Sequence, residues 1–461
     1  MKRIFNLLSI LGLASFVSAS NASAASFTNF YVFSAGDFAS GPNPQATNSD
    51  GINPDGFLLS GNTLYGTAAA GGLYGYGTVF RVDTNGKNFT NLFNFNLGTF
   101  DSTTVTYPDS TGDMPNSGLL LISNTLYGTT FYGGLHDAGT VFKINTDGSG
   151  FALIHAFNFT DGQSPSSGLT LYQGVLYGTT AGGGSNQDGT VFSIGAQGFA
   201  NVYNFTNQEE PYGGVVVSSN IIYGFGRYGG AYSNGVVYSV GIGGGGHGDL
   251  LEFDGTNGSS AYSTPILSGN TLFGVTYQGG TNGGGNVFRI NTDGQGYTNL
   301  YNFPRQSGAN TTGSNPYDFG GLVLSGNKLY GTTSVSGSGG QGTVFQLDTD
   351  GTGFSVLHSF QYTDGSQPFG LVLSGGTLYG MTEYGFQGFS LGDGGLFSLV
   401  LQPTLNLSLA GNQAVLTWND ASYSLYTAPT ITNTFTKLAG ATSGYTTNTA
   451  GAQRFFQIRP N

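Results

Sequence analysis

Residues 321–360 read GLVLSGNKLY GTTSVSGSGG QGTVFQLDTD GTGFSVLHSF, and this stretch decides the fold. It holds four short apolar and aromatic segments, at 322–324, 329–333, 343–347 and 354–360. Ser-Gly-Asn joins the first two and Thr-Asp-Gly the last two, and such turns are typical of β-hairpins. The pattern predicts four antiparallel strands, with a longer Gly/Ser-rich loop at 334–342 between the second and the third.

The same pattern occurs seven times along the chain. An apolar residue, an aromatic residue and a glycine recur at intervals near fifty residues, and the aromatic residues are Tyr65, Tyr127, Tyr177, Tyr223, Phe273, Tyr330 and Tyr379. A second aromatic residue follows each of them: Phe80, Phe142, Phe192, Tyr238, Phe288, Phe345 and Phe397. Four-stranded units of this length are typical of β-propeller blades. A parallel β-helix is the alternative, but its coils are shorter and lack paired Asp-Gly turns.

The two ends of the repeat region complement each other. Residues 27–33 resemble the fourth-strand sequence at 89–95 but have no repeat in front of them, whereas the seventh repeat lacks its fourth strand. We therefore predict an all-β fold with a seven-bladed propeller over residues 25–402, closed by the N-terminal strand, which removes both exposed sheet edges. Phe27, Phe30 and Phe33 should then be largely buried.

After about Pro403 the repeat stops and short alternating strands follow. Residues 403–461 are expected to form a small β-sandwich-like module of roughly immunoglobulin or fibronectin-III type. Trp418, the only tryptophan, is expected at the centre of its core.

The N-terminus has the features of a secretory signal. Lys2 and Arg3 precede an apolar run, and Ala22-Ser23-Ala24 is a small-residue cleavage site, so residues 1–24 are expected to be a signal peptide. A membrane anchor is the weaker alternative, because the run is short and is interrupted by polar residues. We expect an exported protein, either extracellular, on the cell surface or periplasmic, with no transmembrane anchor. Since the chain has no cysteine, its core must hold it without disulfides.

Composition limits the partners. Only 8% of the 461 residues are charged and the formal net charge is −12, which argues against a nucleic-acid partner because phosphate binding needs clustered Lys and Arg. The 81 glycines follow no three-residue period, so they indicate turns in a β protein rather than collagen. The remaining surface is neutral and polar, which suits an extracellular polysaccharide or another cell-surface polymer. The chain is expected to be a monomer.

Three recurring phrases, LYGTTxxGG, GTVFxIxxDGxxF and DGxxPxxGLxLSG, give the repeat region a family resemblance. Over residues 27–402 the chain resembles the GloVer tandem-repeat family of exported bacterial proteins. The resemblance implies an extracytoplasmic, surface-associated protein with a variable C-terminal segment. It implies no established activity and no catalytic residues.

Residues that break the repeat are the candidates for chemistry. The fourth repeat carries Glu209 and Glu210 where others have Asp-Gly or Ser-Asn, and Arg227 in its loop between the second and third strands. A surface ion pair is the simpler interpretation, and a carboxylate pair for acid–base catalysis is the functional one. His155 and His358 fall at fourth-strand positions that carry aromatic residues elsewhere. No established cofactor pattern is present, and no catalytic residue is assigned.

Calcium is the one cofactor that the loops suggest. Asp161 and Asp364 lie in matching Asp-Gly-x-x-Pro loops and are candidate ligands for Ca²⁺, which prefers oxygen. The Asp-Gly hairpin turns also resemble the start of a calcium loop, but they lack the later bidentate Glu and are interpreted as turns.

The acidic residues are expected to gather on one face of the ring. Loops between second and third strands share a face with the loops that follow fourth strands, because successive strands alternate in direction; we call it the long-loop face. Fifteen of the 24 acidic residues fall there: Asp50, Asp55, Asp101, Asp109, Asp113, Asp137, Asp161, Asp188, Glu209, Glu210, Asp254, Asp318, Asp364, Glu383 and Asp393. Only Arg227 and Arg305 oppose them. We expect this face to bind Ca²⁺ or to attract a cationic or hydroxyl-rich partner.

Three functions fit the sequence. The first is a non-enzymatic, secreted or surface-associated recognition or adhesion protein, with a glycan or other extracellular polymer as ligand. The second is a propeller-based carbohydrate-active enzyme that uses Glu209 or Glu210. The third is a purely structural component of the envelope.

Overall fold

A computed structural model gives the fold of the chain. It describes residues 8–10, 26–38, 46–306, 310–316, 321–385, 394–401, 405–410, 413–418, 423–429, 434–448 and 454–460. By its internal contacts the chain divides into two compact units. The larger comprises Thr28–Val372 and Tyr379–Ser398, and the smaller contains Leu399–Asn461 with two short segments from elsewhere in the chain.

The larger unit is a seven-bladed β-propeller, as the repeat predicts. Blade 1 has strands β5 (Ile52–Ser60), β6 (Thr63–Ala70), β7 (Thr78–Asp83) and β8 (Thr90–Asn94). Blade 2 has β9 (Leu120–Ile122), β10 (Thr125–Thr130), β11 (Thr140–Asn145) and β12 (Ala152–Ala156). Blade 3 has β13 (Thr170–Tyr172), β14 (Val175–Thr180), β15 (Thr190–Gly195) and β16 (Gly198–Asn204).

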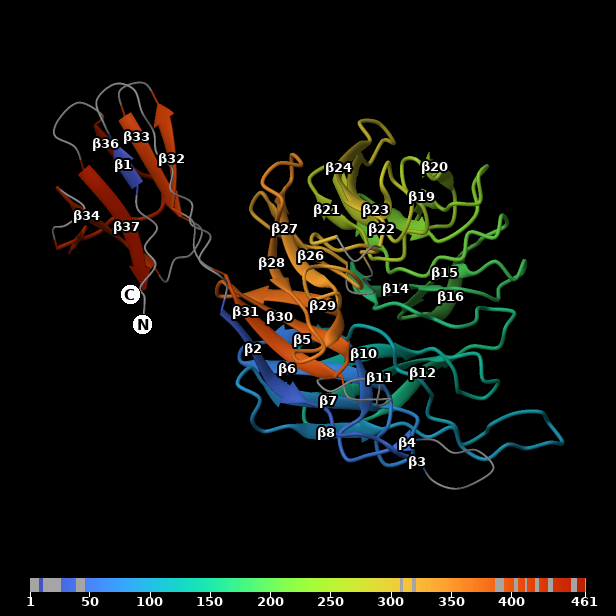
Figure 1. Cartoon of the computed structure of the whole chain (residues 1–461). Helices are drawn as coiled ribbons and strands as arrows, with labels where there is room; N and C mark the ends of the chain where they lie inside the picture. Colours follow the sequence, from blue (N-terminus) through green and yellow to red (C-terminus); the bar gives the residue numbers. More distant parts are fainter. Residues whose placement is uncertain are drawn as a thin grey trace. The chain divides into compact units, whose positions relative to one another are not determined.

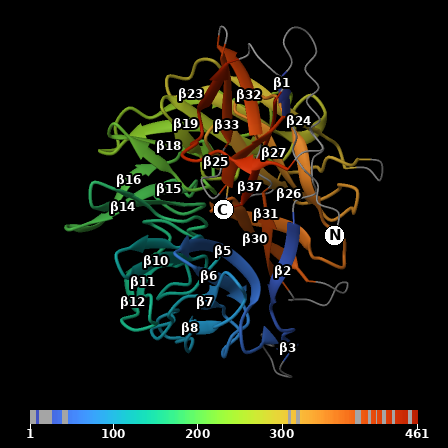
Figure 2. The ribbon, with the colours of Figure 1, turned by 90° about the vertical axis from the view of Figure 1, so that its left-hand side faces the viewer.

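The next three blades repeat this antiparallel order. Blade 4 has β17 (Val216–Ser218), β18 (Ile221–Gly226), β19 (Val236–Gly241) and β20 (Gly248–Glu252). Blade 5 has β21 (Ile266–Ser268), β22 (Thr271–Thr276), β23 (Gly283–Asn291) and β24 (Thr298–Pro304). Blade 6 has β25 (Val323–Ser325), β26 (Lys328–Thr333), β27 (Thr343–Asp348) and β28 (Ser355–Ser359). The blades follow one another around a ring, from blue β5–β8 through green to orange (Figures 1 and 2).

The N-terminal strand completes blade 7 and closes the ring. Its sheet has the order β2 (Ser26–Val32), β31 (Gly395–Val400), β30 (Thr377–Tyr384) and β29 (Ser366–Ser374), so the outer strand comes from the other end of the repeat region (Figure 1). The Phe33 amide also donates a hydrogen bond to the Gly394 carbonyl at 3.0 Å. Phe33 is 1% exposed, as predicted, whereas Phe27 and Phe30 are only partly buried. The closure is confirmed, although only Phe33 of these three rings is fully buried.

The core lies between neighbouring blades. Each third-strand aromatic ring is fully buried: Phe80, Phe142, Phe192, Tyr238, Phe288, Phe345 and Phe397. A second-strand glycine leaves room for it. A Cβ on Gly178, for example, would lie 2.5 Å from Cζ of Phe192. One core cluster joins Val79 of blade 1 to Phe142 of blade 2, so the burial ties each sheet to the next.

The structure confirms that the two kinds of long loop share a face. Four isolated bridges join the loop after a fourth strand to the second-to-third-strand loop of the following blade, and they are Asp113–Tyr132, Gln163–Gly182, Ser259–Gln278 and Ser314–Val335. Asp318 and Asp393, which the sequence also places on this face, lie outside the described residues.

The smaller unit contains two small sheets. One has the order β1 (Leu8–Ile10), β37 (Arg454–Pro460), β34 (Tyr423–Ala428) and β35 (Thr436–Lys437), and the other β32 (Leu405–Ala410), β33 (Gln413–Trp418) and β36 (Tyr445–Asn448). Trp418, 6% exposed, shares one core cluster with Leu416 of its own sheet and with Leu425 and Phe456 of the other. Its central position is thus confirmed, and the immunoglobulin or fibronectin-III type stays a prediction. Strand β1 lies within the expected signal peptide, whose cleavage also stays a prediction.

All these elements are strands. In the part of the chain that the structure describes, no helix is long and apolar enough to cross a membrane. The remaining short strands are β3 (Asp37–Phe38) and β4 (Ala46–Thr47), which pair with each other.

Candidate functional site

The loops of the long-loop face carry most of the exposed large apolar side chains among the described residues. Of fourteen large apolar residues exposed within the described ranges, ten lie in its loops: Leu73, Tyr74, Phe100, Val105, Met114, Tyr132, Leu135, Phe159, Tyr232 and Tyr362. Exposed apolar residues that gather on one surface of a protein commonly mark a binding site. The opposite face consists mainly of two-residue turns and shorter hairpin loops.

Arg227 lies at the centre of a tyrosine cluster on this face. Its guanidinium carbon is 4.6 Å from the ring centre of Tyr228, 4.8 Å from that of Tyr262 and 5.1 Å from that of Tyr212. The three rings come from three loops of blades 4 and 5. Cation–π contacts of this kind hold a guanidinium and the rings in a defined arrangement. We call Arg227, Tyr212, Tyr228 and Tyr262 the Arg–Tyr cluster.

Further rings extend the cluster on both sides. Tyr262 meets Tyr277 edge-on at 5.5 Å, and on the other side Phe131 lies 6.3 Å from Tyr212. Phe131 in turn contacts the exposed ring of Tyr132 at 4.7 Å. The aromatic surface therefore runs from the second-to-third-strand loop of blade 2 to that of blade 5. All of these rings except Tyr132 are partly buried, so they are held in place by their neighbours.

Glu210 lies beside this cluster, and its backbone has a structural explanation. Its φ is 41°, in the left-handed region. The equivalent residue of every blade has φ between 41° and 57°, and these residues are Asn53, Met114, Ser164, Glu210, Ser260, Asn315 and Gln367. In all but Ser260 the next residue is proline. The pKa of Glu210 is raised above its ordinary value, because burial and the charge of Asp188 outweigh the opposing effect of Arg227. The strained φ is thus a feature of the repeat and not of catalysis.

Glu209 is not at the surface, so the surface-ion-pair interpretation is wrong for this residue. Its side chain is 1% exposed. Its Oε2 lies 3.6 Å from Nε2 of His247, and no hydrogen-bond partner for that oxygen is present among the described residues. Glu209 therefore faces His247, whereas Glu210 lies near Arg227. Burial, and next the charge of Glu209, raises the pKa of the nearby Asp249 to about 6.

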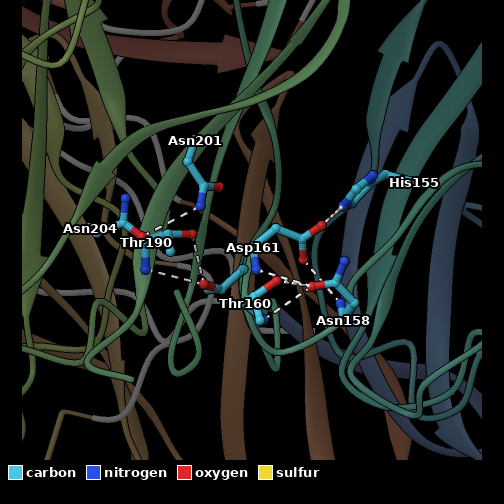
Figure 3. A network of polar contacts seen from close by, with 8 residues as sticks. His155, Asn158, Thr160, Asp161, Thr190, Asn201 and Asn204 are labelled. Atoms are coloured by element: carbon cyan, nitrogen blue, oxygen red, sulfur yellow. Dashed lines mark hydrogen bonds and ion pairs between the residues drawn. The ribbon is translucent and has the colours of Figure 1, made fainter. Parts of the chain in front are cut away.

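The calcium candidates Asp161 and Asp364 lie in separate blade connections, and each has a histidine partner. Oδ2 of Asp161 is 3.1 Å from Nε2 of His155. The backbone amide of Asn158 donates a hydrogen bond to Oδ1 of Asp161 (Figure 3). Oδ2 of Asp364 is 3.0 Å from Nε2 of His358. His155 also stacks on Phe199 of the next blade at 3.8 Å. Because this pairing occurs in two blades, we interpret it as a contact that holds the loop against the strand. Calcium binding by these residues stays a prediction.

Two other acidic residues of the long-loop face titrate far from their ordinary range. Burial, together with repulsion from Glu383, raises the pKa of Asp55 to about 7. Burial, together with repulsion from Asp137, raises the pKa of Asp113 to about 7. Neighbouring carboxylates repel each other at these positions, and this repulsion favours the protonated form of Asp55 and Asp113.

The sequence identified Arg227, Glu209 and Glu210 but missed the residues around them. The three tyrosines of the Arg–Tyr cluster are fifty residues apart at most, in loops whose proximity depends on the ring of blades. His247 lies in a glycine-rich stretch whose sequence gives no sign of its partner. One feature of the sequence does distinguish blade 4 from the others. Tyr238 is the only tyrosine among the seven third-strand aromatic residues.

Comparisons with known proteins support the repeat family. No curated protein matches the chain. Among solved structures, the tricorn protease is 11% identical with a TM-score of 0.36, covering 79% of this chain and 33% of that chain. A nidogen/laminin complex is 13% identical with a TM-score of 0.32, covering 62% of this chain and 97% of that chain. This chain thus spans about a third of the length of the tricorn protease chain.

The family match rests on the repeats themselves. The sequence model of the Gloeobacter/Verrucomicrobia repeat matches residues 98–239 and 195–397. These two overlapping regions cover most of blades 2 to 7 and more than half of the chain, in agreement with the resemblance of its recurring phrases. The chain therefore belongs to the Gloeobacter/Verrucomicrobia repeat family.

Proposed function

We propose that this protein is an exported, non-enzymatic recognition or adhesion protein whose long-loop face binds a hydroxyl-rich polymer, a glycan being the first candidate. The observation that carries the proposal is the aromatic surface around Arg227. Rings from several blades lie there in fixed positions, and most exposed apolar residues of the described chain lie on the same face. The propeller fold and the repeat family are compatible with this role.

The chemistry of the Arg–Tyr cluster suits a sugar surface. An aromatic ring offers a flat apolar face for the C–H side of a sugar ring, and its phenol oxygen offers a hydrogen bond. The guanidinium of Arg227 supplies several donors, and its Nε is buried with no hydrogen-bond partner among the described residues. The carboxyl group of Glu210 beside it accepts hydrogen bonds from hydroxyl groups. Apolar faces with a few fixed polar groups are the usual composition of a carbohydrate-sized site.

A glycan-array screen of the purified chain tests the proposal. We expect binding to a restricted set of neutral or weakly charged glycans, and we expect Arg227→Ala and Tyr262→Ala to weaken it by roughly tenfold or more, the range of a lost binding hot spot. Tyr74→Ala is the matched control, because Tyr74 is exposed on the same face outside the Arg–Tyr cluster and should leave binding unchanged. Binding that survives both cluster variants would place the ligand elsewhere.

A hydrolysis assay on the glycans that bind separates recognition from catalysis. We expect no release of reducing sugar. Turnover that disappears in Glu209→Gln or Glu210→Gln would instead establish the carbohydrate-active enzyme, and no binding to any polymer would favour the structural role in the envelope.

A further inference from the structure

Blade 4 departs from the repeat at several positions that the fold brings together. In blades 1, 2, 3 and 6 a phenylalanine lies at or just before the start of the fourth strand, at Phe89, Phe151, Phe199 and Phe354, and in blade 4 this position is His247. Two residues later, blades 1, 3 and 5 have Asn91, Asn201 and Asn299, and blade 4 has Asp249. The residue that pairs with Asp249 on the third strand is Tyr238, where the other six blades have phenylalanine.

Glu209 meets these residues from the connection between blades 3 and 4. Ligand atoms of Glu209, His247 and Asp249 all lie within 4.8 Å of one another. The ring of His247 is held in place, because it stacks on Tyr203 of blade 3 at 4.3 Å. Glu209 is buried and Asp249 is exposed, so the group has an inner end and an open side. We call these three residues the blade-4 triad.

Orphaned polar atoms point to a missing ligand at the triad. Glu209 Oε2, His247 Nε2 and the hydroxyl of Tyr238 are all buried and have no hydrogen-bond partner among the described residues. Glu209 is 1% exposed and Tyr238 is 0% exposed. A carboxylate buried in this way is costly unless a positive charge compensates it. Glu209 Oε2 and His247 Nε2 face each other at 3.6 Å, beyond ordinary hydrogen-bond distance, so a cation bound between them would give both atoms a partner.

We infer that the blade-4 triad binds one first-row divalent cation, of which Zn²⁺ is the representative. Imidazole with two carboxylates is a ligand set that Zn²⁺ uses and that Ca²⁺ does not prefer. Ligand atoms of a tetrahedral zinc ion lie about 3.4 Å apart, since each bond is about 2.0–2.2 Å long. Glu209 Oε2 and His247 Nε2 are 3.6 Å apart, close to that separation, and the three ligand atoms of the triad, an oxygen of Asp249 among them, all lie within 4.8 Å of one another.

The ion would tie two blades together. Glu209 belongs to the connection after β16 of blade 3, whereas His247 directly precedes the outer strand β20 of blade 4 and Asp249 lies in it. The hydroxyl of Tyr238 would hold a metal-bound water or the Glu209 carboxylate, as outer groups of metal sites do. The triad shares no side chain with the Arg–Tyr cluster, so the inference does not depend on the proposed glycan binding.

The test measures Zn²⁺ binding by the full chain after treatment with EDTA. Calorimetry and metal analysis after dialysis should give one Zn²⁺ per chain at the triad, and saturating Zn²⁺ should raise the melting temperature. Asp249→Asn and His247→Phe should each weaken binding by roughly tenfold or more. Both variants install residues that other blades already carry, so they should fold in the absence of metal, which circular dichroism with EDTA verifies.

His358→Phe is the matched control. His358 also pairs with a carboxylate, Asp364, but no third ligand joins that pair among the described residues, so the variant should keep full Zn²⁺ binding. The visible spectrum of bound Co²⁺ should change in His247→Phe and not in His358→Phe. Zn²⁺ binding that is undetectable in the parent, equal in His247→Phe, or lost in His358→Phe would overturn the inference.

Discussion

Single glycines set how closely the second strand of a blade approaches the third-strand ring. Gly178→Ala places a Cβ 2.5 Å from Cζ of the fully buried Phe192, at a backbone conformation that alanine otherwise tolerates. We expect a loss of about 1–3 kcal/mol in the free energy of unfolding, the usual cost of overpacking. Urea unfolding measures it. Gly243→Ala, where an added Cβ meets nothing within 4 Å, should change that free energy by less than about 0.5 kcal/mol.

The buried carboxyl groups make stability depend on pH. The pKa of Asp55 rises from about 4 to about 7 on folding, so the folded state binds more protons than the unfolded state between these pH values. Its contribution to the free energy of unfolding therefore falls as pH rises from about 4 towards 7. We expect the melting temperature to be lower at pH 8 than at pH 5.5, and Asp55→Asn to recover part of the loss at pH 8. Asp147→Asn is the control, because that carboxyl group is exposed and Ser149 lowers its pKa. If Asp55→Asn left the dependence of melting temperature on pH unchanged, Asp55 would not be the group responsible.

The closing strand β2 is the element on which the ring depends. Phe33 packs edge-on against Phe80 at 5.3 Å and belongs to a core cluster that joins blades 7 and 1. Phe33→Ala should lower the free energy of unfolding by about 3–5 kcal/mol. Its neighbour Val32 is 48% exposed, so Val32→Ala should cost less than about 0.5 kcal/mol.

Removing the whole strand has a second consequence. Deletion of residues 26–33 leaves β31 as an open edge, which is a template for pairing with another chain. Light scattering should show self-association together with a lower melting temperature. A deletion variant that stays monomeric and as stable as the parent would contradict closure by β2.

The two compact units of the molecule are expected to unfold separately. Trp418 is the only tryptophan and lies in the core of the smaller unit, so tryptophan fluorescence reports on that unit alone. A unit of this size buries a smaller fraction of its surface than the propeller does, so its transition should come at a lower urea concentration than the loss of the far-UV β signal. Coincident transitions would show that the two units unfold as one. Deleting residues 403–461 should remove the fluorescence transition and leave the other in place.

The sequence by itself determined the seven blades, their four strands and the closure by β2. Alternating apolar residues, Asx-Gly turns and the orphan strand at 27–33 are local signals, and they act through hydrogen bonds between strands that are near in sequence or repeat on a fixed period. It also determined that acidic residues gather on the long-loop face, because strand direction alone assigns each loop to a face.

Only the tertiary structure decided which side chains meet. Arg227 lies among rings from three loops, and Glu209 reaches His247 across the boundary between blades 3 and 4. Tyr212 and Tyr262 occupy equivalent positions one repeat apart, but the period alone does not predict that their rings meet at Arg227. Whether a carboxyl group lies buried like Glu209 or pairs like Asp161 depends on how adjacent blades pack, since burial and partner distance are set by the neighbouring sheet and not by the loop that carries the residue.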